Sequence, residues 1–145
     1  MNDIRIRFAT IDDAAIVSHH DKYITAALLK DKIIHKEVIV IYVRESFAGW
    51  LRYNLFWDQI PFMNMLFLLP EYRGKGIGKK LVQFWEGEMK AQGHKRLMTS
   101  SQQNEFAQHF YVTLGYKAIG GFTLSGDSFE IIFEKEWFLK QQRKS

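Results

Sequence analysis

The first third of the chain alternates between strand and helix patterns. Residues 4–8 place apolar and basic side chains in turn, which is the period of a half-buried strand. Thr10 precedes an interrupted helical pattern over residues 12–32, so we expect two short helices there. The continuous β-branched run of residues 38–43 predicts a strand that is covered on both faces. The core-facing positions expected in the two helices are Ile16, Val17, Tyr23, Ile24, Ala27 and Leu28.

The rest of the chain predicts a hairpin, a long helix and a closing set of strands. Residues 49–57 and 62–69 have the composition of two hairpin strands. After a glycine-rich turn, apolar residues recur at every fourth position over residues 77–89, as in an amphipathic helix, and Gly93 ends that pattern. The remaining expected elements are a strand at 96–101, a helix at 104–114 and an antiparallel pair of strands at 116–124 and 129–134.

Composition narrows the class of protein. A length of 145 residues suits one domain, which we expect to span residues 1–145, and 47% hydrophobic with 25% charged residues is typical of a globular chain. The chain contains no cysteine, which excludes disulfides and thiolate metal sites. We therefore expect a cytoplasmic protein without a metal. The lack of a long apolar segment predicts that no membrane is involved.

The basic charge of the chain favours an anionic ligand. The net charge is +4, and the tightest cationic group, Lys75, Lys79 and Lys80, lies in and just after the glycine-rich turn. Nucleic-acid-binding proteins usually arrange their cations in stripes, often with aromatic residues between them. The placement here instead indicates a phosphate group on a small ligand, and no nucleic-acid partner is expected.

The glycine-rich turn at residues 74–78 follows a strand and opens a helix. Free N–H groups at a helix N-terminus, together with glycines that let the backbone approach closely, suit a pyrophosphate. The sequence lacks the Gly-Lys-Ser/Thr ending of a nucleoside triphosphate loop. It also lacks the last glycine interval and the acidic residue of a dinucleotide loop. Neither of these two phosphate-binding loops is therefore expected.

Two motifs suggest a third kind of loop. Arg73, Gly76 and Gly78 form the pattern Arg-x-x-Gly-x-Gly, and here the sequence resembles the Gcn5-related N-acetyltransferase (GNAT) family. Asn104 is followed seven positions later by Tyr111, in a segment that ends in Gly-Tyr, as is frequent in that family. The resemblance implies an α/β (α+β) fold with a mixed, mostly antiparallel sheet of six to seven strands. About four helices would flank this sheet, which would splay between its fourth and fifth strands.

The resemblance also implies an acyltransferase that uses acetyl-CoA. Backbone groups of Leu66 and Leu68 would bind the pantetheine arm as an added strand does, and the Leu68 amide would polarise the thioester carbonyl. Tyr111 would donate a proton to the leaving thiolate after direct attack by an amine, with no acyl-enzyme. The residues implied in binding acetyl-CoA are Leu66, Leu68, Arg73, Gly74, Lys75, Gly76, Ile77, Gly78, Lys79 and Asn104.

The general base and the acceptor stay open at this point. Relatives often carry Glu or His where this chain has Phe62 and Asn64, and neither of these residues accepts a proton usefully. The base is then a water chain ordered by Asn64, or a carboxylate such as Glu45 or Asp58. The acceptor is a primary amine of a small molecule or of a protein, and the aromatic strand suits a cation. The predicted substrate residues are Trp50, Tyr53 and Asn64.

Two other functions compete with this interpretation. A non-catalytic acyl-CoA sensor would bind the donor without turnover, and the missing strand carboxylate favours it. A nucleic-acid-binding domain would bind with a steep dependence on salt, and the lack of a basic stripe argues against it. A homodimer formed through the closing strands is left open.

Overall fold

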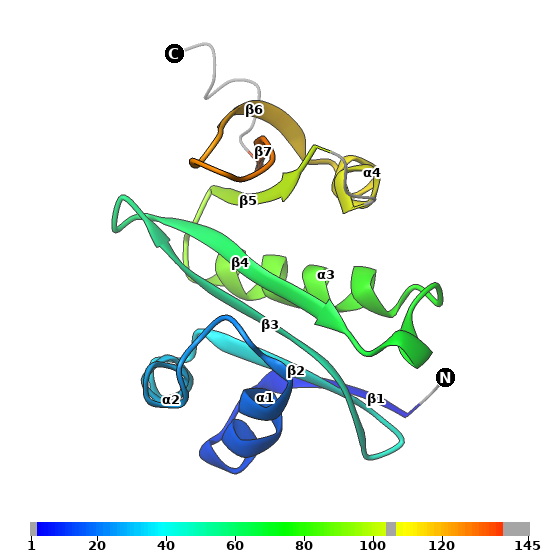
Figure 1. Cartoon of the computed structure of the whole chain (residues 1–145). Coiled ribbons are helices and arrows are strands. Elements are labelled where there is room, and N and C mark those ends of the chain that lie inside the picture. Colours follow the sequence, from blue (N-terminus) through cyan, green and yellow to red (C-terminus); the bar gives the residue numbers. More distant parts are fainter. Residues whose placement is uncertain (1–2, 104–106, 138–145) are drawn as a thin grey trace. The chain divides into compact units, whose positions relative to one another are not determined.

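Strands of one sheet and helices on its faces make up the fold (Figure 1). The computed structural model describes residues 3–103 and 107–137, and within them the seven strands follow the order β1-β2-β3-β4-β5-β7-β6. The strands are β1 (Ile4–Phe8), β2 (Val38–Val43), β3 (Ser46–Phe56), β4 (Ile60–Leu68), β5 (Arg96–Gln102), β6 (Lys117–Phe122) and β7 (Glu130–Glu136). The α-helices are α1 (Ala14–His20), α2 (Ala26–Ile34), α3 (Ile77–Ala91) and α4 (Ala107–Thr113), and 3-10 turns lie at Ile11–Asp13 and Pro70–Tyr72.

The element order confirms the predicted mixed sheet, although the first strand of the hairpin begins earlier than expected. β3 begins at Ser46 rather than at residue 49, because Arg44 and Glu45 close a tight turn and Val43 pairs directly with Ser46. The first residues of the helix expected from Asn104 lie outside the described residues. β4 and β5 run parallel, with Phe62 opposite Met98 as one of the two paired positions, and the sheet splays between them as predicted.

The chain divides into two compact units. The first unit comprises Met1–Tyr53 and Met65–Gly87, and the second comprises Asn54–Asn64 and Glu88–Ser145. β3, β4 and α3 each contribute residues to both units. The glycine-rich turn therefore belongs to the first unit and Tyr111 to the second.

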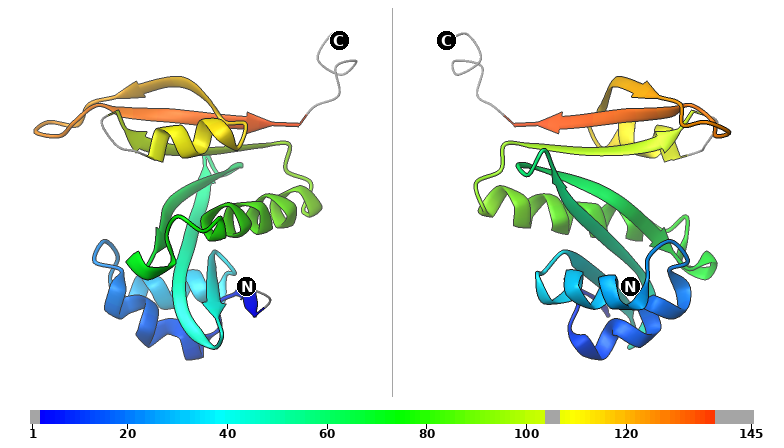
Figure 2. Two further views of the ribbon diagram at one scale, coloured as in Figure 1. Left: turned by 90° about the vertical axis from the view of Figure 1, so that its right-hand side faces the viewer. Right: turned by 60° about the vertical axis from the view of Figure 1, so that its left-hand side comes forward.

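Helices cover both faces of the strands in the first unit. Val38 of β2 packs in one hydrophobic cluster with residues of α1 and α2, among them Leu29. Side chains alternate along a strand, so the neighbouring Ile39 points to the opposite face. Ile39 pairs with Phe8, whose ring centre lies 6.0 Å from that of Phe84 in α3. α3 therefore covers the face opposite to α1 and α2, as Figure 2 shows.

The inward face of α2 differs from the predicted one. Leu29 and Ile33, which lie four positions apart, are buried. The Thr25 hydroxyl accepts a hydrogen bond from the Leu28 amide at 3.2 Å, so Thr25 caps a helix that begins at Ala26. The interrupted pattern of residues 12–32 did not reveal that α2 begins at Ala26. The buried position was therefore predicted at Leu28, one residue before the buried Leu29. The residues predicted in the core but exposed are Tyr23, Ala27 and Leu28.

A buried carboxylate joins the segment after α1 to β3. Asp21 is 3% exposed, and its carboxylate accepts hydrogen bonds from Trp50 Nε1 at 3.0 Å and from Arg52 Nε at 2.7 Å. The Tyr23 amide donates a further hydrogen bond at 3.1 Å. A buried ion pair is tolerated only where hydrogen bonds satisfy it, and removal of one partner leaves the other charge buried alone. Asp21 and Arg52 therefore depend on each other.

A second polar cluster fixes the start of the first unit. The Asp13 carboxylate accepts hydrogen bonds at 2.7 Å from Arg7 Nη1, from the Thr10 amide and from the Tyr42 hydroxyl. Burial opposes ionisation of Asp13, but these hydrogen bonds outweigh it and lower its pKa to about 2. Burial and the hydrogen bond to Asp13 raise the pKa of Tyr42 to about 12. The cluster ties the turn before α1 to β1 and β2.

The second unit is built around β7. Phe133 of β7 is buried, and its ring centre lies 5.8 Å from that of Tyr111 in α4. The Thr99 hydroxyl of β5 donates to the Met63 carbonyl at 3.0 Å, which supports the parallel pairing of β5 with β4. β6 forms the edge of the sheet, and all its residues are exposed. Among the described residues, no helix has the length and apolar character needed to cross a bilayer.

Candidate active site

The end of β4 directs alternate backbone groups away from β3. The Leu69 amide donates to the Ala48 carbonyl of β3 at 2.8 Å. Along a strand in an antiparallel pair, the N–H and C=O of one residue face one neighbour, and those of the next residue face the other side. Leu66 and Leu68 therefore turn their N–H and C=O groups away from β3. The Leu66 groups and the Leu68 amide thus have the orientation that an extended ligand would need to add as a strand, while the Leu68 carbonyl accepts a hydrogen bond from Arg73 Nε.

A glycine permits the close approach of β3 and β4 at this point. Gly49 of β3 is buried, and a Cβ atom there would overlap the carbonyl oxygen of Phe67 and lie 2.8 Å from Leu68 Cδ2. No other residue type fits without moving one of the two backbones. Gly49 thus holds the end of β4 in place, a role that the sequence analysis did not assign to it.

The Arg73 side chain braces the turn after β4. Its Nε donates to the Leu68 carbonyl at 2.8 Å, and its guanidinium carbon lies 4.9 Å from the ring centre of Phe67. The Arg73 amide donates to the Pro70 carbonyl at 3.2 Å. The Arg73 amide therefore already has an acceptor, and among the described residues the run of amides without one begins at Gly74. The role of Arg73 in binding acetyl-CoA stays a prediction.

Six consecutive amides, those of residues 74–79, have no hydrogen-bond acceptor within the described part of the chain. Backbone bonding resumes where the Lys80 amide donates to the Gly76 carbonyl at 3.3 Å. Gly74 and Gly76 have φ angles of +73° and +79°, a region that favours glycine, and no atom lies within 4 Å of their Cβ positions. Free amides and the positive end of the α3 dipole together bind anions well.

Lysine side chains add positive charge around these amides. Lys75 and Lys79 are exposed, and neither forms an ion pair with any residue that the structure describes. An ammonium group on a flexible stem reaches phosphate oxygens as a point charge. Ile77, in contrast, is 1% exposed, so only its backbone is available to a ligand.

The chain matches known acetyltransferases in sequence and in structure. Residues 8–116 match the sequence model of the acetyltransferase (GNAT) family. The chain belongs to this family. The match covers both motifs from which the acyltransferase class was predicted, so the family and the enzyme class are confirmed. No curated protein matches the chain in sequence.

Solved structures share the fold of this GNAT protein at low sequence identity. Ard1 from Thermoplasma volcanium has a TM-score of 0.80 at 16% identity, covering 94% of this chain and 99% of its own. The PaiA N-acetyltransferase from Thermoplasma acidophilum, solved with coenzyme A, has a TM-score of 0.76 at 20% identity, covering 92% and 99%. Naa50 from Arabidopsis thaliana, solved with the bisubstrate analogue CoA-Ac-MVNAL, has a TM-score of 0.76 at 15% sequence identity. The match covers 93% of this chain and 99% of Naa50. These likenesses confirm the predicted fold.

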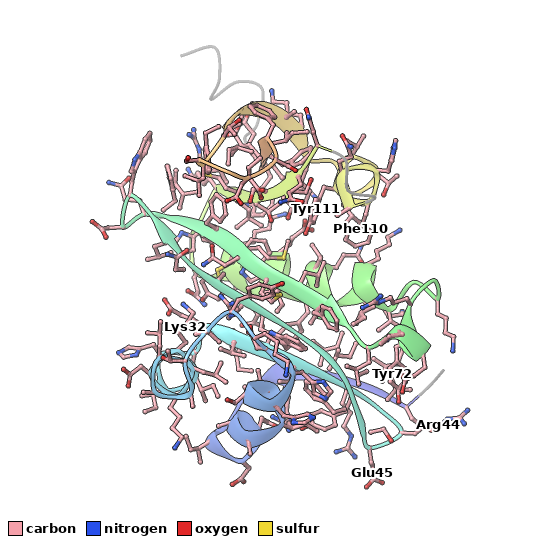
Figure 3. The ribbon with its side chains drawn as sticks, in the orientation of Figure 1. Lys32, Arg44, Glu45, Tyr72, Phe110 and Tyr111 are labelled. Carbon is pink, nitrogen blue, oxygen red and sulfur yellow. The ribbon has the colours of Figure 1, made fainter. Side chains whose placement is uncertain are left out.

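The predicted acid of this GNAT protein lies in the second unit. Tyr111 sits on α4, next to Phe110, as labelled in Figure 3. Its side chain is buried, and the ring centres of Tyr116 and Phe133 each lie 5.8 Å from its own. Asn104 lies outside the described residues. The roles assigned to Tyr111 and Asn104 stay predictions.

The candidates for the general base are all exposed. Glu45 lies in the turn between β2 and β3, and Asp58 lies in the turn between β3 and β4. The Asn64 side-chain amide donates to Asn54 Oδ1 at 2.8 Å, which leaves the Asn64 side-chain oxygen available to a water molecule. Both forms of the base hypothesis therefore stay open.

Two residues predicted to contact the acceptor lie in the core of the first unit. Trp50 is 1% exposed, and its indole N–H is held by Asp21. Tyr53 is also buried, its hydroxyl donates to the Lys36 carbonyl at 3.3 Å, and its ring lies beside Trp85. Packing accounts for both side chains, and their contact with an acceptor stays a prediction.

A hollow beside the glycine-rich turn was missed by the sequence analysis. It has a volume of about 340 Å³ and lies within the first unit. No motif pointed to it, because its walls come from three separate segments: the start of β1, the turn between β2 and β3, and the turn before α3. The residues that line it are Asp3, Val43, Arg44, Ser46, Tyr72, Lys75 and Ile77.

Proposed function

We propose that this GNAT protein transfers an acetyl group from acetyl-CoA to a primary amine of a small molecule or of a protein. The observation that carries the proposal is the run of six amides at residues 74–79, across the start of α3, for which the described residues provide no acceptor. A diphosphate is the part of coenzyme A that such amides hold, with Lys75 and Lys79 reaching its oxygens. The relatives solved with coenzyme A and, in yncA from Salmonella typhimurium, with acetyl-CoA support this donor.

The proposed chemistry is direct transfer without an acyl-enzyme. A neutral amine attacks the thioester carbon, so that a C–N bond forms, the C–S bond breaks and the electron pair leaves on sulfur. The Leu68 amide, which points away from β3, would stabilise the negative charge that develops on the thioester oxygen. Arg73 holds the Leu68 carbonyl and thereby fixes the position of this residue.

Two proton transfers complete the reaction. An alkylammonium group has a pKa of about 10.4, so it must lose a proton before its nitrogen can attack. We propose water held by Asn64 as the acceptor of that proton, with Glu45 or Asp58 as the alternative, and Tyr111 as the donor to the departing thiolate. A sharp pKa in the pH–rate profile that disappears on replacing Glu45 or Asp58 would reject the water route.

The first experiment measures thiol release from acetyl-CoA in the presence of an amine panel. The panel contains peptides with free α-amines, peptides with lysine, diamines and amino sugars. Turnover with any of these amines supports the proposal. Calorimetric binding of coenzyme A with no turnover on any amine favours the acyl-CoA sensor instead. Absence of both binding and turnover contradicts the proposed function altogether.

A pair of glycine variants tests the amide cradle directly. Gly76 and Gly93 both have left-handed φ angles and open space around their Cβ positions. Gly76→Ala and Gly93→Ala should therefore lose similar stability, about 1 kcal/mol each. Only Gly76→Ala should weaken coenzyme A binding, because its methyl group would stand where the diphosphate approaches. Equal affinities in the two variants would show that the cradle does not bind the donor.

We also propose that the chain forms a single N-acetyltransferase domain over residues 1–145 and works in the cytoplasm. The absence of cysteine and the family match support this. The concentration of lysines at the glycine-rich turn supports a small anionic ligand rather than a nucleic acid. Sedimentation at several protein concentrations tests the homodimer that the sequence left open.

A further inference from the structure

We infer that the hollow beside the glycine-rich turn binds a phosphate monoester, the 3′-phosphate of the coenzyme A donor. The inference rests on the proposed function and adds a specificity site to it. Lys75 and Ile77 line the hollow and also lie within the run of amides at residues 74–79, so the hollow adjoins the proposed diphosphate cradle. In coenzyme A the 3′-phosphate and the diphosphate are attached to the same ribose. A ligand held by the cradle therefore presents its second anionic group close by.

The charges that face the hollow favour an anion. Arg44 and Lys75 line it, and neither forms an ion pair with any residue of the described ranges. Ser46 and Tyr72 add hydroxyl donors that have no recorded partner in residues 3–103 and 107–137, and Figure 3 shows Tyr72 beside the turn that carries Arg44. Asp3 is the acid in the lining, and two cations against one anion leave the hollow positive.

A second hollow nearby differs from the first in the charges that line it. It has a volume of about 400 Å³ and shares Asp3 and Arg44 with the first, but its other charged residues are Arg5 and Glu45. Two cations and two anions face this second hollow, so it has no excess of positive charge. The positive hollow is therefore the one that includes Lys75 and adjoins the cradle. A phosphate monoester carries a charge of about −1.5 to −2 at neutral pH, which an arginine and a lysine together match.

The backbone of the Arg44 turn is strained. Arg44 and Glu45 have φ angles of +50° and +69°, in a region where glycine or asparagine is usual in two-residue hairpin turns. The Arg44 amide donates to the Asp3 carbonyl at 3.0 Å, which ties this turn to the start of β1. An arginine at a position that favours asparagine or glycine agrees with a role for its side chain.

The test compares acetyl-CoA with acetyl-3′-dephospho-CoA as donors. The wild-type protein should show a KM for the dephospho donor about three- to tenfold higher, the range between an exposed ion pair and a charge-assisted hydrogen bond. Arg44→Asn removes the charge and suits the left-handed turn. It should raise the KM for acetyl-CoA by a similar factor and leave the KM for the dephospho donor unchanged. Arg44→Lys should keep part of the difference in KM between the two donors that Arg44→Asn removes. Asp3→Asn should make that difference larger than in the wild-type protein.

Arg5→Gln is the matched control, because Arg5 lines only the second hollow. It should leave both KM values unchanged. Equal KM values for the two donors in the wild-type protein would overturn the inference, and so would an Arg44→Asn variant that raises both KM values equally. Inorganic phosphate should compete more strongly with acetyl-CoA than with the dephospho donor; if it binds without competing with either, the hollow serves a separate anion and the inference is wrong.

The proposed function and this inference fail in different ways. If the protein binds and turns over both donors equally well, the acetyltransferase proposal stands and only the 3′-phosphate site is rejected. If neither donor binds in calorimetry, the proposed function fails and the inference fails with it.

Discussion

Replacement of Gly49 by alanine should loosen the end of β4 from β3. The new Cβ would lie 2.8 Å from Leu68 Cδ2 and 3.1 Å from Leu68 Cα, and it would overlap the Phe67 carbonyl oxygen. Ordinary contacts of a methyl carbon lie at about 3.5–4.0 Å. The Leu68 side chain can rotate away, but the Phe67 carbonyl belongs to the backbone, so the two strands must separate.

The expected loss of stability follows from two contributions. Overpacking of a buried site costs about 1–3 kcal/mol. The hydrogen bond from the Leu69 amide to Ala48, two residues along β4 from the overlap, would lengthen, and its loss would cost about 1 kcal/mol more. We therefore expect Gly49→Ala to lower the free energy of unfolding by about 2–4 kcal/mol, as measured by urea denaturation. Coenzyme A affinity should fall as well, because Leu66 and Leu68 would shift.

Gly87→Ala provides the control for this experiment. Gly87 lies inside α3, is exposed, and has no atom within 4 Å of its Cβ position. Alanine there should raise the free energy of unfolding by about 0.5–1 kcal/mol, because glycine is a poor helix former. The reasoning about Gly49 is refuted if Gly49→Ala unfolds within about 0.5 kcal/mol of the wild-type protein.

Three further predictions concern single side chains. Asp21→Asn leaves the buried Arg52 without its counter-charge and should destabilise the protein by about 3–5 kcal/mol in urea denaturation, whereas an unchanged midpoint would contradict the burial of this pair. The folded-state pKa of Asp13 is about 2, below its unfolded value. The ionised carboxylate therefore adds to the free energy of unfolding above about pH 4, and this contribution is lost as the pH falls through 2. Because Arg7 is partly exposed, we expect that contribution to be about 1–2 kcal/mol, and Asp13→Asn should flatten the acid limb of stability against pH. Tyr111→Phe should lower kcat by about 10²-fold or more with little change in the KM for acetyl-CoA, and an unchanged kcat would remove Tyr111 from the reaction.

Strong local patterns made part of the fold predictable. Ile77, Leu81, Trp85 and Met89 are all buried, as the four-residue period of α3 predicted, because residues at this spacing lie on one face of a helix. The glycine-rich turn was predictable for a related reason. Left-handed φ angles and close approach of an anion both favour glycine, so the glycines in the sequence indicate this backbone geometry.

Features that depend on partners distant in sequence could not be predicted. Asp21 and Arg52 are 31 positions apart, and neither lies in a pattern that marks a buried ion pair. The part played by Gly49 depends on which residues of β3 and β4 face each other. No pattern in the sequence predicted that pairing register. Trp50 was assigned to the acceptor site because aromatic side chains suit both a binding site and a core, and composition does not separate these two roles.

The difference between backbone and side-chain recognition explains why the donor is easier to infer than the acceptor. The proposed diphosphate cradle consists of main-chain amides, so it requires only a few glycines and a correctly placed strand end. Chains that share 15% to 20% of their residues with this one still reach TM-scores of 0.76 to 0.80, because packing preserves that backbone while the side chains vary. An acceptor is recognised by the side chains that surround its amine, and those positions are free to change. The specificity of this enzyme must therefore be measured on amines, whereas the donor site can be tested first by changing Gly49 and Gly76.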